Sequence, residues 1–249
     1  MTAPSPQPIR NRPVSKTDDD RWPKRVFKWT YGRIHRLSWV QQSLLVGAIL
    51  TARWLESVPP ELNQRLVRDA ILLAVLPLLL ASLHDRHLGW RVDRRAVWNT
   101  VILALFVLPF YVVGSSLPTI RHYYPMWSTS PAPSVFIPHA IKLFLLALAT
   151  ETYYRGLLCV GVREIGPKAA FISPIVYAFG HLTKPPIELA LSGPTDVLFG
   201  LVDYDANSIL PSVVAHGAGL VLLDWLVLHD PVIPPQTVVQ WLEWLPVHL

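Results

Sequence analysis

The residues with the clearest capacity for chemistry are Glu151 and Arg155, which lie in the otherwise apolar stretch LLALATETYYRGLL at residues 145–158. A spacing of four residues places both side chains on one face of a helix, where they can form an ion pair. A buried ion pair adds little net stability, so a pair that only fixes helix packing is the less favoured interpretation. A carboxylate held beside a cation can instead take a proton from water.

Two histidines could work with this carboxylate. His181 ends the stretch FISPIVYAFGH, with Tyr177 one helical turn before it, and His216 lies in SVVAHGAGLVLL among small residues that would admit another backbone or a substrate. An ionisable side chain in a membrane segment is a functional candidate by default. Asp224, two turns after His216, could orient that ring, help to bind a metal or lie at the membrane interface. Tyr154 could donate a hydrogen bond.

The composition predicts that membrane helices position these residues. The chain has 249 residues, of which 51% are hydrophobic and 16% charged, and its mean hydropathy is +0.34. Continuous apolar runs exclude a membrane β-barrel, whose strands alternate. We therefore expect an all-α, polytopic membrane protein with about six to eight membrane-embedded or interfacial helices. The five predicted spans are residues 37–55, 66–83, 97–116, 136–159 and 208–228, with a short helix at 169–182, a break at 183–196 and a short apolar piece at 197–202.

Charge divides the chain and orients it. Residues 1–36 are basic and proline-rich, which predicts a disordered or membrane-surface arm, and residues 37–249 form the helical membrane domain, with the chemically interesting core at 136–228. The four arginines of residues 84–95 and the basic arm predict a cytoplasmic N-terminus in a multi-pass membrane protein. The location that we expect is the bacterial inner membrane. The net charge of +5 is thus a topology signal and does not indicate nucleic acid. The single cysteine, Cys159, excludes an intrachain disulfide.

Several common site motifs are absent. The sequence has no HExxH, no pair of CxxC motifs, no phosphate-binding glycine loop and no GxSxG, which excludes the usual soluble metalloprotease, nucleotide-binding and serine-hydrolase interpretations. No internal repeat supports a transporter. Two histidines and a carboxylate suffice for catalytic zinc, so a zinc site at Glu151, His181 and His216 stays open as an alternative.

Three stretches together resemble the CPBP family of intramembrane proteases, which includes the CaaX prenyl proteases and is also called ABI or Rce1-like. They are ETYYRG at 151–156, YAFGH at 177–181 and NSILPSVVAH at 207–216, and the likeness covers roughly residues 85–228. The chain departs from the family pattern at two positions. Thr150 stands where the family has the first of two glutamates, and Leu220 stands where it has an Asn-like residue.

The resemblance implies a glutamic-type intramembrane protease without a cofactor. Glu151, with His181, would activate water, His216 would donate to the oxyanion, and Arg155 would hold Glu151, with Tyr177 among the supporting residues. The substrate would be a membrane protein or peptide, for example a C-terminal anchor, cut near its membrane end. The two departures support a second hypothesis, an inactive membrane scaffold or immunity factor that binds a peptide. A zinc-dependent membrane protease is the third.

Overall fold

The computed structural model describes residues 37–56 and 59–246, so the basic arm predicted for residues 1–36 lies outside the described part. Every regular element within these ranges is helical, which confirms the all-α prediction. Four helices are long and apolar enough to cross a membrane, and they coincide with four of the five predicted spans: Leu62–Leu83, Arg94–Gly114, Pro133–Leu157 and Leu210–Val227. The first predicted span forms α2 (Trp39–Glu56), which is not among the four.

The first of these spans combines α3 (Leu62–Asp69), η2 (Ala70–Val75) and α4 (Leu76–Leu83) into one continuous helix. Pro77 lacks a backbone N–H, and its ring crowds the carbonyl four residues earlier. The segment directly before the proline is a π-helical turn, which is wider than an α-helical turn. The wider turn gives the proline ring room without ending the helix.

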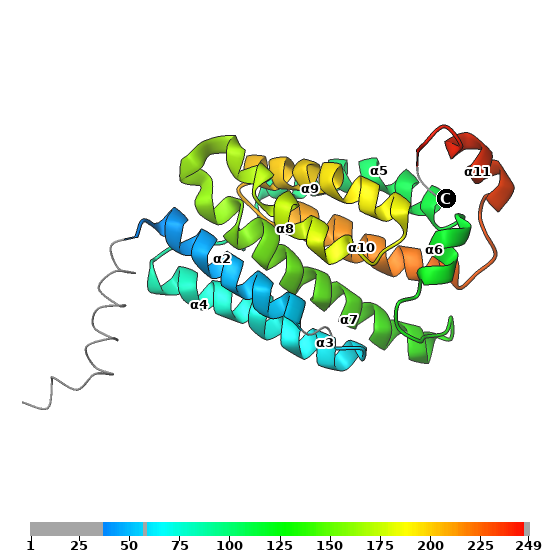
Figure 1. Ribbon diagram of the computed structural model, residues 1–249, viewed down its shortest axis with the longest axis horizontal. Helices are drawn as coiled ribbons and strands as arrows, with labels where there is room; N and C mark the ends of the chain where they lie inside the picture. Colours follow the sequence, from blue (N-terminus) through cyan, green and yellow to red (C-terminus); the bar gives the residue numbers. More distant parts are fainter. Residues whose placement is uncertain (1–36, 57–58, 247–249) are drawn as a thin grey trace, which may run out of the picture. The chain divides into compact units, whose positions relative to one another are not determined.

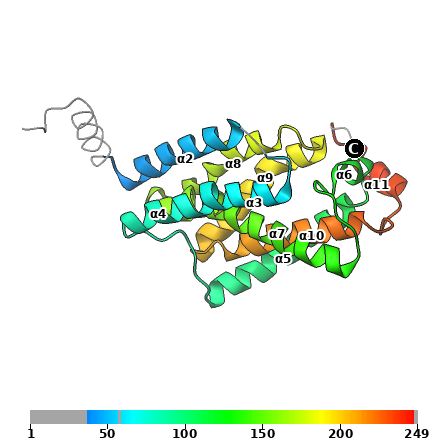
Figure 2. The same cartoon turned by 90° about the horizontal axis from the view of Figure 1, so that it is seen from below.

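The helices from Trp39 onward belong to one compact unit, and α7 (Pro133–Glu151) runs through its middle (Figures 1 and 2). It packs against α3 and η2 on one side and against α10 (Leu210–Val227) on the other. In turn α10 packs along α5 (Arg94–Gly114) and α9 (Pro186–Ala206). At one end, α6 (Pro118–Tyr123) and α11 (Pro235–Leu242) share a small apolar core with the end of α10.

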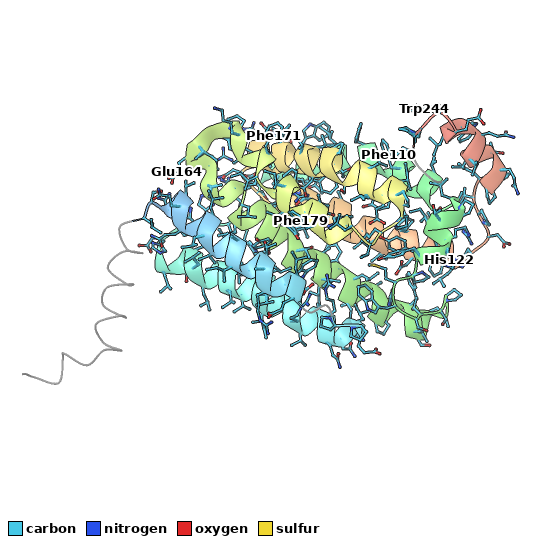
Figure 3. All side chains as sticks on the ribbon, viewed as in Figure 1. Phe110, His122, Glu164, Phe171, Phe179 and Trp244 are labelled. Carbon is cyan, nitrogen blue, oxygen red and sulfur yellow. The ribbon has the colours of Figure 1, made fainter. Side chains whose placement is uncertain are left out.

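Large apolar side chains also cover outward-facing surfaces of these helices. Leu105 and Phe106 on α5 and Ile137 on α7 are more than half exposed. Phe110, labelled in Figure 3, continues the apolar surface of α5. In water such a surface would be unfavourable, whereas lipid chains cover it without cost. The exposed faces therefore fit a bilayer environment.

The segment after α7 differs from the predicted helix at 169–182. The chain continues as a π-helical turn η3 (Thr152–Leu157), then as η4 (Val160–Phe171), α8 (Ser173–Tyr177) and η5 (Ala178–His181). Gly166 has a φ of 78°, a left-handed conformation that favours glycine, and Pro167 and Pro174 remove backbone donors. The prediction of one regular helix is wrong because the range 169–182 is divided among the end of η4, α8 and η5, with Pro174 inside it and Gly166 and Pro167 just before it.

The predicted break at 183–196 is also wrong in its extent. Only the residues before Pro186 form a connection, and α9 then runs without interruption from Pro186 to Ala206 despite Pro194 in its interior. One face of α9 is buried along its whole length, with Ile187, Asp196, Phe199 and Asp203 pointing inward. Burial of this face outweighs the cost of about 3 kcal/mol for an interior proline. The short apolar piece predicted at 197–202 is therefore the middle of a long helix.

The loop between α4 and α5 holds the start of α10. Asp93 caps α5 by accepting a hydrogen bond from the backbone N–H of Ala96 at 2.8 Å. Earlier in the loop, the carbonyl of Gly89 accepts a hydrogen bond from the backbone N–H of Ile209 at 3.0 Å, and Ser208 donates to the carbonyl of Arg91 at 2.6 Å. These contacts fix the first turn of α10 and with it the position of His216.

Candidate active site

Glu151 and His216 form the centre of the site. Glu151 ends α7 and is fully buried, whereas His216 lies in the second turn of α10 with 17% of its side chain exposed. The Nδ1 atom of His216 lies 2.6 Å from Oε1 of Glu151. When the carboxylate accepts the proton of Nδ1, a neutral imidazole leaves Nε2 free to accept another proton. The imidazole of His216 can therefore accept a proton at Nε2, while the carboxylate of Glu151 fixes the orientation of the ring.

A buried ionic chain fixes Glu151 from behind. The Nε of Arg155, on η3, lies 3.3 Å from Oε2 of Glu151, and Nη1 of Arg155 lies 2.5 Å from Oδ1 of Asp196 on α9. Ser173, at the start of α8, donates to Oδ2 of Asp196 at 2.6 Å. These groups are all buried and have lost their contact with water. Each charge is therefore stabilised only by the charges and hydrogen bonds of its neighbours. The chain continues through Glu151 to His216.

Asp203 makes a second link between α9 and α10. It lies two helical turns after Asp196, and it accepts hydrogen bonds from the backbone N–H of Ser212 at 3.1 Å and from the Ser212 hydroxyl at 2.5 Å. Ser212 precedes His216 by one turn, so this link fixes the part of α10 that carries the imidazole. Asp196 and Asp203 are not among the predicted site residues, because the expected break ends at Asp196 and the expected apolar piece ends before Asp203. Their spacing of seven residues on one helix was the available signal.

His181 lies at the end of η5, with its ring stacked near that of Tyr177 at a centroid distance of 4.2 Å. Its Nδ1 donates to the carbonyl oxygen of Tyr177 at 3.1 Å, and its Nε2 lies 3.6 Å from Oε1 of Glu188 on α9. Burial, followed by the charge of Lys184, lowers the pKa of His181 to about 4. The ring is therefore neutral at pH 7, and its Nε2 is an acceptor.

Glu188 gathers polar groups around this second histidine. Besides its contact with His181, it forms a 2.5 Å ion pair with Lys184 and accepts hydrogen bonds from the hydroxyl of Tyr124 at 3.0 and 2.9 Å. Sequence analysis assigned no role to any of these three residues. The signal was weak, because Lys184 and Glu188 flank two prolines in a segment that was predicted to be a break.

Tyr177 lies between the two histidine environments. The guanidinium carbon of Arg155 is 5.5 Å from the centroid of the Tyr177 ring, whose other neighbours are His181 and Tyr154. His216 is close enough to His181 to disfavour protonation of the His181 ring. In the part of the chain that the structure describes, however, His181 makes no direct contact with Glu151 or His216. The structure thus joins two of the three predicted catalytic residues and places the third nearby.

Two predicted supporting residues have other partners. Tyr154 is buried and packs edge-on against Tyr177, at a centroid distance of 5.1 Å. Asp224 points toward α7, where it lies 2.7 Å from Nε2 of His139 in a second buried pair. The suggestion that Asp224 orients His216 is therefore wrong, because eight residues of α-helix rotate the side chain by about 80° from the His216 direction. The same contact gives His139 a partner that the sequence did not indicate.

The donor atoms do not fit the zinc alternative. Within residues 37–56 and 59–246, no three His, Cys, Asp or Glu side chains lie close enough together to hold a metal ion. One oxygen of Glu151 contacts His216, and the other lies 3.3 Å from Nε of Arg155 in an ion pair. The imidazole of His181 is turned toward Tyr177 and Glu188, so the three proposed ligands do not converge.

The two departures from the family pattern are also visible. The hydroxyl of Thr150 bonds backward to the carbonyl of Ala147 at 2.9 Å, within its own helix. Leu220 packs among apolar residues of α6, α7 and α11. Neither side chain brings an acid or a hydrogen-bond donor to the Glu151–His216 pair.

Comparison with known proteins assigns the part of the chain that contains this site. Residues 132–220 match the family model described as type II CAAX prenyl endopeptidase Rce1-like. The matched segment contains Glu151, Arg155, Tyr177, His181 and His216. Searches of curated proteins and of solved structures returned no match. The resemblance inferred from the sequence is confirmed for residues 132–220, the part of this membrane protein that is similar to the Rce1-like, CAAX-protease type family.

Proposed function

We propose that this protein is an intramembrane endopeptidase that hydrolyses a peptide bond with water, without a metal ion. The observation that carries the proposal is the 2.6 Å contact between Glu151 and His216, in which a buried carboxylate orients an imidazole inside a membrane-spanning core. The family match supports the reaction class. The donor geometry around Glu151 supports acid–base catalysis over zinc catalysis.

The geometry favours His216 as the group that moves the proton. With Nδ1 held by Glu151, Nε2 takes a proton from water while the water oxygen bonds to the substrate carbonyl carbon. The carboxylate stabilises the imidazolium that forms. His216 then returns the proton to the departing amide nitrogen as the C–N bond breaks. This role differs from the oxyanion-donating role that the family resemblance implies for His216.

His181 and Arg155 complete the proposed machinery. His181 stays neutral, so its Nε2 can accept a hydrogen bond from the attacking water and orient it. Arg155 compensates the buried charge of Glu151 and is itself held by Asp196. Tyr177 packs between the two groups and fixes their separation.

The surroundings support a substrate that is anchored in the membrane. The catalytic pair lies at the junction of two candidate spans whose outer faces are apolar. A peptide bond close to the membrane end of a protein or peptide, such as a C-terminal anchor, would reach this pair most directly. With a cytoplasmic N-terminus, Glu151 lies toward the cytoplasmic half of the bilayer.

The test is cleavage of a panel of membrane-anchored peptides by purified protein in detergent. We expect cleavage by the wild type, loss of at least about 100-fold in Glu151→Gln, and no effect of a chelator. Glu164→Gln is the matched control, because Glu164 is exposed and pairs with Arg86 at the surface. Loss of activity on chelation would restore the zinc alternative, and full activity of Glu151→Gln would refute the proposed pair.

The second candidate is a membrane scaffold or immunity factor that has lost catalysis. The observation in its favour is Thr150, whose hydroxyl is engaged by its own helix where the family pattern has a glutamate. Such a protein would bind a membrane peptide without cutting it. Binding of the peptide that is equal in the wild type and Glu151→Gln, with intact peptide recovered from both, would favour this function.

A further inference from the structure

Tyr111 on α5 reaches the helix that carries His216. Its ring lies so close to Gly219 that a Cβ atom built on that glycine would be 2.1 Å from Cζ and 2.3 Å from the hydroxyl oxygen. No side chain other than hydrogen fits there. Gly219 follows His216 by three residues, so the two positions are neighbours on one face of α10. The phenolic end of Tyr111 therefore lies beside the histidine of the catalytic pair.

The hydroxyl of Tyr111 has an unused hydrogen-bond donor. It has no hydrogen-bond partner among the residues that the structure describes, and the ring that carries it packs against two apolar clusters. Tyr111 also lies close enough to both Glu151 and Glu188 to be influenced by their charges. It is thus within range of the Glu151–His216 pair and of the carboxylate that contacts His181.

Peptide hydrolysis at this site needs a donor for the substrate carbonyl oxygen. In the proposed mechanism Nε2 of His216 and Nε2 of His181 both act as acceptors, so neither can stabilise the developing negative charge. Thr150 donates to its own helix, and Leu220 has no donor. The oxyanion would otherwise be poorly stabilised, although one good donor typically raises kcat about 100- to 1,000-fold.

We propose that Tyr111 is a further catalytic residue, whose phenolic O–H donates a hydrogen bond to the substrate carbonyl oxygen as it becomes an oxyanion. This inference rests on the proposed endopeptidase function. Tyr111 keeps its proton throughout, because the proton from water passes to His216 and then to the leaving nitrogen. Gly219 has no side chain and so leaves the space that the Tyr111 ring occupies.

The decisive variant is Tyr111→Phe, which keeps the ring against Gly219 and removes only the hydroxyl. With a peptide that the wild type cleaves, we expect kcat to fall by about 100- to 1,000-fold, with KM within about threefold and an unchanged thermal unfolding midpoint. Tyr204→Phe on α9 is the control, because the Tyr204 ring packs under Arg163, away from the catalytic pair. This variant should have the activity of the wild type.

A transition-state analogue separates this role from a structural one. A peptide aldehyde with the same sequence adds water to form a tetrahedral gem-diol that resembles the intermediate, so Tyr111→Phe should weaken its inhibition by about the same factor as kcat. Wild-type cleavage with unchanged kcat in Tyr111→Phe would overturn the role of Tyr111 and leave the endopeptidase proposal intact. A loss of kcat with unchanged aldehyde affinity would also overturn it. If the wild type cleaves no peptide of the panel, both proposals fall together.

Discussion

The buried link between Arg155 and Asp196 predicts a large, measurable loss of stability in Asp196→Asn. The substitution keeps the size of the side chain and its capacity to accept from Ser173, but it removes the charge that lies 2.5 Å from Nη1 of Arg155. Breaking a buried pair costs about 3–5 kcal/mol. We expect the lower end, about 3 kcal/mol, because Arg155 retains Glu151 as a partner at 3.3 Å.

For a membrane domain of this size, such a loss lowers the thermal unfolding midpoint in detergent by roughly 6–12 °C. Asp205→Asn is the matched control on the same helix. Asp205 pairs with Arg95 at the surface, where its side chain is 51% exposed, and an exposed pair contributes only about 0–1 kcal/mol. Equal midpoints for the two variants would refute the claim that Asp196 compensates a buried arginine.

Three further predictions concern other parts of the structure. Folding lowers the pKa of His181 from 6.5 to about 4. As the pH falls, His181 is therefore protonated in the unfolded chain before it is protonated in the folded protein. Stability should therefore decrease as the pH falls from about 6.5 to 4, by at most about 3 kcal/mol, in a pH titration of chemical unfolding, and His181→Asn should lack this component. Asp224→Asn should lower the unfolding midpoint by breaking the buried pair with His139, yet change kcat less than about threefold, because His139 lies about 18 Å along α7 from Glu151. Gly219→Ala should displace the Tyr111 ring and lower kcat, with an effect that does not add to that of Tyr111→Phe in a double-mutant cycle.

Each of these outcomes has a clear contrary result. A pH dependence of stability that persists in His181→Asn would contradict the neutral, buried imidazole, and the exposed His87→Asn should behave as the wild type. A large fall of kcat in Asp224→Asn would mean that the second buried pair serves the reaction. Fully additive losses in Gly219→Ala and Tyr111→Phe would mean that the two residues act independently.

The apolar runs predicted the membrane helices well because their signal is local. The four candidate spans begin and end within about four residues of the predicted limits, since a bilayer imposes a minimum length on each run. The errors lie where polar residues and prolines alternate with apolar ones. Pro194 indicated a break in α9, but the buried face of that helix decided the outcome. No pattern within residues 183–206 shows the partners that stabilise it.

The sequence predicted which residues belong to the candidate site better than it predicted which of them are in contact. Glu151 and His216 were identified because ionisable residues in apolar runs are rare, and the structure places them together. The direction of Asp224 toward His139 depends on the rotation of α10 against α7, which spacing alone gives only approximately. Tyr111 has no sequence signal, because an isolated tyrosine in an apolar span resembles any other. Its proximity to Gly219 arises from the packing of α5 on α10.

The two buried aspartates of α9 have a consequence for how the protein is made. Each candidate span can enter the bilayer by its own hydrophobicity, and Arg155 enters with Glu151 on the same helix as a ready neutral pair. By contrast α9 is not among those spans, and it brings the carboxyl groups of Asp196 and Asp203 to the interior. Its buried position therefore depends on Arg155 and Ser212, which these carboxyl groups contact. The site is completed by contacts between helices rather than by any helix alone.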